Sequence, residues 1–361
     1  MAEATQTKTT IAIDPVTRIE GHLKAEVVVE NGKVVDAKLT GGMYRGFESI
    51  LRGRHPRDAA QIVQRICGVC PTAHATAASI ALEKASGTAV PSNGRATRNL
   101  ILGANYLQSH ILHFYHLAGQ DFIQGPDTAP FMPRYAKPDL RLPPAINAVG
   151  VDQYVEALEV RAVCHEMVAL FGGRMPHVHG ILAGGAAEIP TKEKLVEYAA
   201  RFKKVRKFVE EKYLPVVYLV GSQYKDLGAF GQGYRNALCV GVFPLDDEGK
   251  EFVFKAGAYQ DGKDMPFDVK RVTEDVKYSW FADSTSGKPF TKGENVLEVD
   301  KKGAYSFVKA PLYNGKPMEV GPLARMWVNN KPISPIGQKL FKEYFGLDVK
   351  NFRDMGEDLA F

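Results

Sequence analysis

Two cysteines three positions apart are the residues of this sequence best suited to chemistry. Residues 65–74 read RICGVCPTAH, which places Cys67 and Cys70 close together and His74 four positions later. A thiol with a pKa of about 8.5 loses its proton on binding a metal, so the pair favours nickel, iron or zinc. Three simpler interpretations compete: half of a zinc site, a redox-active pair, and two core cysteines. The redox pair is disfavoured because no βαβ pattern precedes it, and zinc would need four ligands without a second Cys-x-x-Cys.

The composition excludes several other classes of protein. The 361 residues are 45% hydrophobic and 24% charged, as in ordinary globular proteins. The other two cysteines, Cys164 and Cys239, stand alone and are predicted to be core residues. Lys and Arg number 46 against 41 Asp and Glu, and no nucleic-acid-binding motif accompanies this mild excess, so we expect no nucleic acid partner. The sequence has no apolar run of 18 residues and no visible export signal, so any membrane attachment or export should come through a partner.

The elements that must position the thiols are mainly helical. Apolar residues recur at helical spacing over 58–85, and Pro71 is expected to kink this stretch or to start a second helix directly after Cys70. Gly87 offers a C-terminal stop. Similar patterns predict further helices, long enough to bury one another, over residues 95–120, 151–171 and 192–220.

Strands are expected on both sides of this helical region. Apolar and polar residues alternate over 23–30, and a second extended run follows over 33–40. Asn31-Gly32 separates the two runs, which predicts a β-hairpin with a type I′ turn. After residue 221 the sequence is rich in Gly, Pro, Asp and aromatic residues, with strand-like pieces at 239–243, 251–255 and 305–308. The predicted fold class is therefore α+β and mainly helical, with a central helical bundle, an N-terminal β-hairpin and a loop-rich β appendage. The predicted regions are 1–57 (strand and hairpin), 58–220 (helical core with the cysteine pair) and 221–361 (loop-rich α+β).

Three sequence blocks taken together carry a resemblance to a known family. They read TRIEGH at 17–22, RGFE at 45–48 and RICGVC at 65–70, and further matches are SHILHFYHL at 109–117 and FGGRMPH at 171–177. The sequence resembles the large subunit of [NiFe] hydrogenases, most closely the H2-uptake group, over essentially its whole length.

The resemblance implies a nickel-iron centre, with carbonyl and cyanide ligands on the iron, that splits H2 heterolytically. By position in the motifs, Cys67 would be a terminal nickel thiolate and Cys70 a thiolate bridging the two metals. Glu20 would relay protons as a partly buried glutamate whose pKa is raised by desolvation, and Glu48 would help to bind Mg²⁺. His74 would donate a hydrogen bond to a cysteine sulfur. Without the family, Glu20 would be read as an ion-pair partner and Glu48 as a surface acid.

Other histidines receive weaker assignments. His110, His113 and His116 spread over a third of a helix circumference, so packing and hydrogen bonding are favoured over metal binding. His177 lies in a Gly-rich loop that the family places toward the iron-sulfur subunit. The chain has no cysteine set of its own for iron-sulfur clusters, so electrons from H2 would pass to an iron-sulfur small subunit in a heterodimer. Location would follow that subunit, either periplasmic or membrane-associated, with a cytoplasmic location as the alternative.

The sequence departs from the family at one point. The family uses four thiolates from two Cys-x-x-Cys motifs, and this sequence contains only the first motif. We therefore expect a truncated or split large subunit, whose second motif would be supplied by a separate C-terminal fragment. The alternatives are a non-catalytic subunit like the one in respiratory complex I that shares this fold without nickel, and a structural zinc protein using Cys67, Cys70 and His74.

Overall fold

A computed structural model describes residues 8–134, 138–292 and 294–361. The chain forms two compact units, each built from stretches that are distant in the sequence. The first unit takes in residues 1–52 and 268–318, and the second takes in 53–267 and 319–361. The three sequence regions with boundaries at 57/58 and 220/221 stay a prediction.

The first unit is built from two small antiparallel sheets. One sheet has the strand order β1-β2-β3, with β1 at Lys8–Ile13, β2 at Leu23–Glu30 and β3 at Lys33–Gly41. Asn31 and Gly32 join β2 to β3 with positive φ angles of 51° and 76°. The other sheet has the order β12-β11-β13, from Lys288–Pro289, Val272–Asp275 and Ala310–Tyr313. A short helix, α1, spans Phe47–Leu51.

The strand predicted at 305–308 is wrong, because the backbone there bonds to separate segments, Tyr305 to Tyr278 and Phe307 to Gly41, and does not form a continuous ladder with either. Ser306 forms a single isolated bridge with Ser279. The Ser306 hydroxyl accepts hydrogen bonds from the backbone N–H groups of Gly41 and Val308, both at 3.1 Å. A serine that captures backbone donors in this way offers the chain an alternative to regular strand pairing.

The second unit is mainly helical, which confirms the predicted mainly helical α+β class. Its helices are α2 at Ala59–Ile62, α3 at Pro71–Ser86, α4 at Ser92–Leu112, α5 at Pro144–Gly172, α6 at Lys192–Phe208, α7 at Leu214–Gln223, α8 at Pro322–Asn329, α9 at Pro335–Phe345 and α10 at Glu357–Ala360. π-Helical segments extend α4 over His113–Ala118 and join α6 to α7 over Val209–Tyr213. Short strands are β4 at Ile181–Leu182, β5 at Gly185–Ala186, β6 at Ala237–Cys239, β7 at Val242–Pro244, β8 at Phe252–Phe254, β9 at Gly257–Gln260 and β10 at Lys263–Met265.

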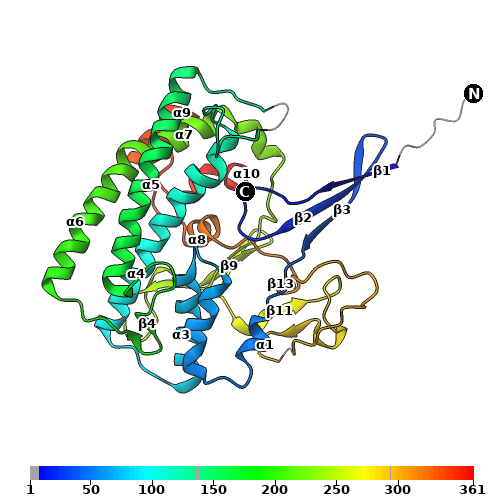
Figure 1. Cartoon of the computed structure of the whole chain (residues 1–361), viewed down its shortest axis with the longest axis vertical. Coiled ribbons are helices and arrows are strands. Elements are labelled where there is room, and N and C mark those ends of the chain that lie inside the picture. Colours follow the sequence, from blue (N-terminus) through cyan, green and yellow to red (C-terminus); the bar gives the residue numbers. More distant parts are fainter. Residues whose placement is uncertain (1–7, 135–137, 293) are drawn as a thin grey trace, which may run out of the picture. The chain divides into compact units, whose positions relative to one another are not determined.

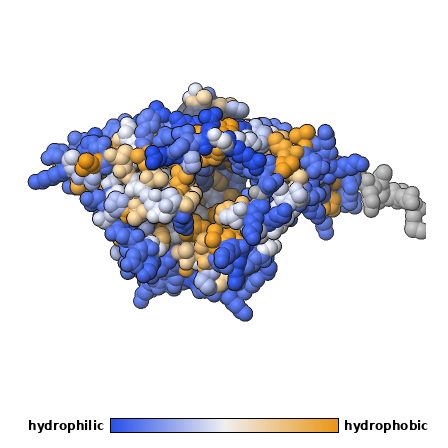
Figure 2. All heavy atoms as spheres, turned by 90° about the horizontal axis from the view of Figure 1, so that it is seen from below, coloured by the Kyte–Doolittle hydropathy of each residue, from blue (hydrophilic) through white to orange (hydrophobic). Residues whose placement is uncertain are grey.

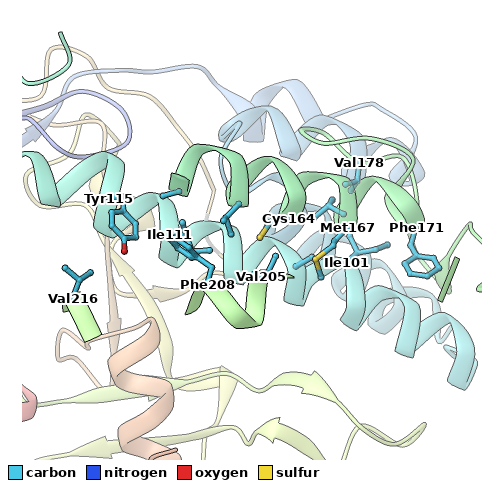
Figure 3. Packing of buried hydrophobic residues seen from close by; sticks show 14 of the residues in the cluster. Ile101, Ile111, Tyr115, Cys164, Met167, Phe171, Val178, Val205, Phe208 and Val216 are labelled. Atoms are coloured by element: carbon cyan, nitrogen blue, oxygen red, sulfur yellow. The ribbon is translucent and has the colours of Figure 1, made fainter. Parts of the chain in front are cut away.

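Helices α4, α5 and α6 lie side by side and enclose the main core (Figure 1). On α4 the buried residues recur every three or four positions, as at Ile101, Ala104 and Ile111, so one face of the helix points inward. Figure 3 shows Ile101 and Ile111 facing Cys164 and Met167 of α5. This packing holds α4 as a rigid support against which neighbouring segments can be positioned.

The outer surface is of mixed polarity. The face drawn in Figure 2 carries separate hydrophobic patches among hydrophilic residues. Among the described residues, we find no helix with the length and apolar content needed to cross a membrane.

Candidate metal centre

Both thiols lie on a short non-helical link between two helical segments of the second unit. A 3₁₀ turn at Val63–Ile66 ends at Cys67, whose backbone is extended, and α3 begins with Pro71 directly after Cys70. Proline has no N–H and is tolerated at the first helical position, where that group would be unpaired, but not in a helix interior. The helix predicted over 58–85 is therefore interrupted at 67–70, and α3 ends at Gly87 with a left-handed φ of 68°.

The backbone of this link points toward one of the sulfurs. The N–H groups of Val69 and Cys70 lie 3.3 and 3.4 Å from the Cys67 Sγ and donate to it. Hydrogen bonds to a charged sulfur favour its thiolate form, which is the form that binds metals. Cys67 and Cys70 are half-buried, and neither forms a disulfide.

Cys70 lies in the wall of a cavity of about 470 Å³ within the second unit. The opposite wall comes from α4 and from α8, and Arg325 of α8 stacks over the Tyr106 ring at 5.0 Å. The Cys70 thiol therefore lies beside a space large enough for a bound group. Its lining residues are Cys70, Ala73, Asn105, Tyr106, Ser109, His110, His113, Pro322 and Arg325.

The histidines of α4 and its π-helical extension divide into two groups. The prediction of packing and hydrogen bonding holds for His116, whose Nε2 lies 3.2 Å from the Tyr154 carbonyl. His110 and His113 instead line the cavity, a placement that helical spacing alone did not reveal. Desolvation lowers the pKa of His110, and the positive charge of Arg325 lowers it further. His110 therefore faces the cavity as a neutral imidazole near pH 7.

The cysteine pair does not form a complete metal site with neighbouring residues. Over residues 8–134, 138–292 and 294–361, no three His, Cys, Asp or Glu side chains are grouped to hold a metal ion. His74 lies half-buried in the first turn of α3, but it does not join Cys67 and Cys70 in such a group, so the zinc alternative lacks its third ligand. Two thiols suit a soft metal.

Glu20 and Glu48 belong to the first unit and are both exposed there. Glu48 lies in the first turn of α1, and Glu20 lies in the irregular segment between β1 and β2. In that segment His22 Nε2 is 2.7 Å from the Asp14 carboxylate. The partial burial expected for Glu20 is not present, because the surrounding residues 17–21 form bends rather than a packed element.

The two lone cysteines are buried, as predicted. Cys164 is 0% exposed and Cys239 is 1% exposed. Burial raises the pKa of the Cys164 thiol to about 12. Such a thiol stays protonated at neutral pH and behaves as a small apolar side chain.

Comparison with known proteins identifies the family. The model of the nickel-dependent hydrogenase family matches residues 45–125 and 120–350, and a model described as HoxL-like matches residues 10–40. The periplasmic [NiFeSe] hydrogenase large subunit of Desulfomicrobium baculatum is 60% identical over 359 residues, which cover 97% of this chain and 70% of that protein. The hydrogenase-2 large chain of Escherichia coli K12 is 33% identical, covering 88% of this chain and 67% of that one.

Solved structures of hydrogenases support the same family. The reduced Ni-Fe-Se hydrogenase of D. vulgaris Hildenborough is 70% identical and superposes with a TM-score of 0.95, covering 98% of this chain and 74% of that chain. The chain therefore belongs to the nickel-dependent hydrogenase family. Within that family it is a large subunit, the catalytic component of an oxidoreductase that acts on H2. The alternative of a non-catalytic subunit without nickel is not favoured by these likenesses.

Proposed function

We propose that this large subunit cleaves H2 at a nickel-iron centre held on one side by Cys67 and Cys70. The observation that carries the proposal is the placement of both thiols on one short link, with Cys70 in the wall of the cavity of about 470 Å³. The likeness to nickel-dependent hydrogenases over residues 45–350 supports nickel as the metal. When bound, a nickel-iron centre whose iron carries carbonyl and cyanide would polarise H2 and cleave it heterolytically.

The two sulfurs would have different roles. We assign Cys67 as the terminal nickel ligand, and its sulfur would also accept the proton released from H2. The N–H groups of Val69 and Cys70 support this role because they stabilise negative charge on the Cys67 sulfur. Cys70 would bridge the two metals from the cavity wall, and His74, one turn along α3, would donate a hydrogen bond to a cysteine sulfur.

Two glutamates of the first unit receive roles from the family resemblance alone. Glu20 would relay protons toward solvent. Because Glu20 is exposed within its own unit, it can exchange protons with water readily. Glu48 would supply a carboxylate oxygen to Mg²⁺, a hard cation that prefers oxygen ligands.

The proposal requires partners. Four cysteines, of which two are the proposed ligands, leave this chain no set for an iron-sulfur cluster. An iron-sulfur small subunit would therefore take the electrons in a heterodimer. The family resemblance implies two more thiolates on the metals, which a separate C-terminal fragment with a second Cys-x-x-Cys could supply. The Desulfomicrobium baculatum relative is named periplasmic, and we propose a periplasmic location here too, with membrane association through the small subunit.

Metal analysis and infrared spectroscopy of the assembled, H2-consuming complex test the proposal. We expect nickel and iron in equal amounts, and infrared bands from carbonyl and cyanide. One equivalent of zinc without nickel would contradict it. Magnesium content measured in the parental complex and in a Glu48→Gln variant checks the assignment of Glu48.

A further inference from the structure

A buried amide on α4 holds the link that carries the two thiols. Asn105 is 2% exposed, and its Nδ2 donates to the Val69 carbonyl at 3.2 Å. Its Oδ1 accepts a hydrogen bond from the Thr72 hydroxyl. Val69 precedes Cys70 and Thr72 follows two positions after it, so one side chain holds the chain on both sides of this thiol, through the Val69 backbone and the Thr72 hydroxyl.

The Asn105 amide is itself held by a hydrogen-bond network in the helical core. Its Nδ2 also lies 3.3 Å from the Ser109 hydroxyl, which accepts a second hydrogen bond from Gln108 Nε2 at 3.2 Å. The Oε1 of Gln108, a fully buried residue, lies 3.1 Å from Arg161 Nε and 3.4 Å from His165 Nε2 on α5. A largely desolvated network of this kind has few alternative arrangements, so it fixes the orientation of Asn105.

The held carbonyl belongs to the peptide group between Val69 and Cys70, and the N–H of that same peptide group donates to the Cys67 sulfur. The N–H of Cys70 lies 3.4 Å from the Cys67 Sγ, while the C=O of Val69 accepts a hydrogen bond from Asn105. Because a peptide group is planar, rotation of this carbonyl away from Asn105 would turn the Cys70 N–H away from the sulfur. We propose that Asn105 is a positioning residue that sets the geometry and charge environment of the Cys67 and Cys70 ligands. This inference rests on the proposed function of these thiols.

A matched residue elsewhere in the second unit separates positioning from simple structural support. Asn147 of α5 is 6% exposed, its Nδ2 donates to the Leu142 carbonyl at 2.8 Å, and its Oδ1 accepts from the Gln124 N–H at 3.0 Å. Like Asn105, it is a buried asparagine that bonds two other segments of the chain, here through two backbone groups, but these segments carry no cysteine. Both asparagines should contribute to stability, whereas only Asn105 should affect the thiol pair.

The test measures Cd²⁺ binding by the full 361-residue chain through the thiolate absorbance. The variants are Asn105→Asp and Asn147→Asp, with thermal unfolding recorded for each. Aspartate keeps the size of asparagine and the acceptor for Thr72, but it replaces the donor to the Val69 carbonyl with an oxygen. We expect Asn105→Asp to weaken Cd²⁺ binding about tenfold or more, as for other residues that orient metal ligands. Asn147→Asp should change it by less than about twofold while lowering the unfolding temperature.

Equal Cd²⁺ affinity in the two variants would overturn the inference. Should Asn105→Asp fail to fold, Thr72→Val removes the donor to Asn105 at nearly constant volume and should weaken Cd²⁺ binding in the same direction. Unchanged binding in a folded Thr72→Val chain would then overturn it. Cd²⁺ binding by the Cys67→Ser and Cys70→Ser variants shows whether the two thiols bind metal at all. It therefore distinguishes failure of the Asn105 inference from failure of the proposed function. If the parental chain binds Cd²⁺ no better than these variants, the proposed use of the thiols is wrong, and the positioning role falls with it.

Discussion

The cysteine-bearing link and the core of the helical bundle place the same residue type in opposite surroundings. Cys67 and Cys70 are half-buried on irregular backbone, with N–H groups directed at the Cys67 sulfur and a cavity beside Cys70. Cys164 lies inside a continuous helix among apolar side chains and is fully buried (Figure 3). The comparison teaches that backbone donors and open space favour the reactive thiolate form of a cysteine, whereas burial among apolar side chains keeps the thiol protonated and inert.

The largest expected effect comes from exchanging sulfur for oxygen in the two surroundings. Cys70→Ser in the assembled hydrogenase should reduce H2 oxidation to background and remove the carbonyl and cyanide bands, because an alkoxide is a poor bridge between soft metals. Helix content by circular dichroism should stay unchanged. Cys164→Ser should keep the bands and lose only stability, by about 1–3 kcal/mol for burying a hydroxyl. Retained H2 oxidation in Cys70→Ser would contradict the assigned role.

The rate of thiol labelling compares Cys67 and Cys70 with Cys164 in the chain without metal. With a pKa of about 12, Cys164 has roughly one molecule in 10⁴ as thiolate at pH 8. Iodoacetamide should therefore modify Cys67 and Cys70 in the native chain and leave Cys164 unmodified until the chain unfolds. Mass spectrometry of digested samples taken over time measures this order. Equal labelling rates for Cys70 and Cys164 in the native chain would break the comparison.

A carboxylate that is not a nickel or iron ligand tests whether proton transfer can be separated from metal binding. Glu20→Gln should lower the rate of H2 oxidation by about 10²–10⁴-fold, the usual contribution of a general acid or base. Nickel and iron contents and the infrared bands should match those of the parental complex, since an exposed residue of the first unit has no part in holding the thiols. Turnover at the parental rate would show that another group carries the proton.

The smallest expected effect is a pH dependence of stability that comes from His165, in the helical core. Burial lowers the pKa of His165 below its usual value of 6.5, and the nearby Arg161 lowers it further. The unfolded chain therefore binds this proton more readily than the folded chain does, so His165 costs stability once pH falls below about 6.5. Thermal unfolding from about pH 8 to about pH 5 should show a shallower loss of stability in His165→Gln than in the parent. A steeper loss in the variant would contradict this sign.

Local chemistry made part of this structure predictable from the sequence. Pro71 cannot continue a helix that began before Cys67, and Gly87 adopts a left-handed φ at low cost, so both ends of α3 follow from single residues. The placement of Cys67 and Cys70 on one short link also follows from their spacing and from Pro71. Burial of Cys164 was likewise predictable, because a lone cysteine in a helical pattern is usually a core residue.

Features that depend on distant residues were not predictable in this way. The cavity beside Cys70 is completed by Arg325, more than two hundred positions later in the sequence, and nothing in its local pattern indicates that contact. Asn105 is one of several polar residues on the buried face of α4, so the helical pattern does not single it out, although a buried polar side chain signals a specific hydrogen-bond partner. Helices α8 and α9 were hidden in a Gly- and Pro-rich region, where Pro322 and Pro335 in fact start helices.

Anomalous X-ray scattering at the nickel and iron edges, from crystals of the H2-consuming assembly, tests the central claim most directly. The account predicts one nickel and one iron peak, with the Cys70 sulfur bonded to both metals and the Cys67 sulfur bonded to nickel alone. Absence of anomalous density at these two sulfurs in an active assembly would contradict it.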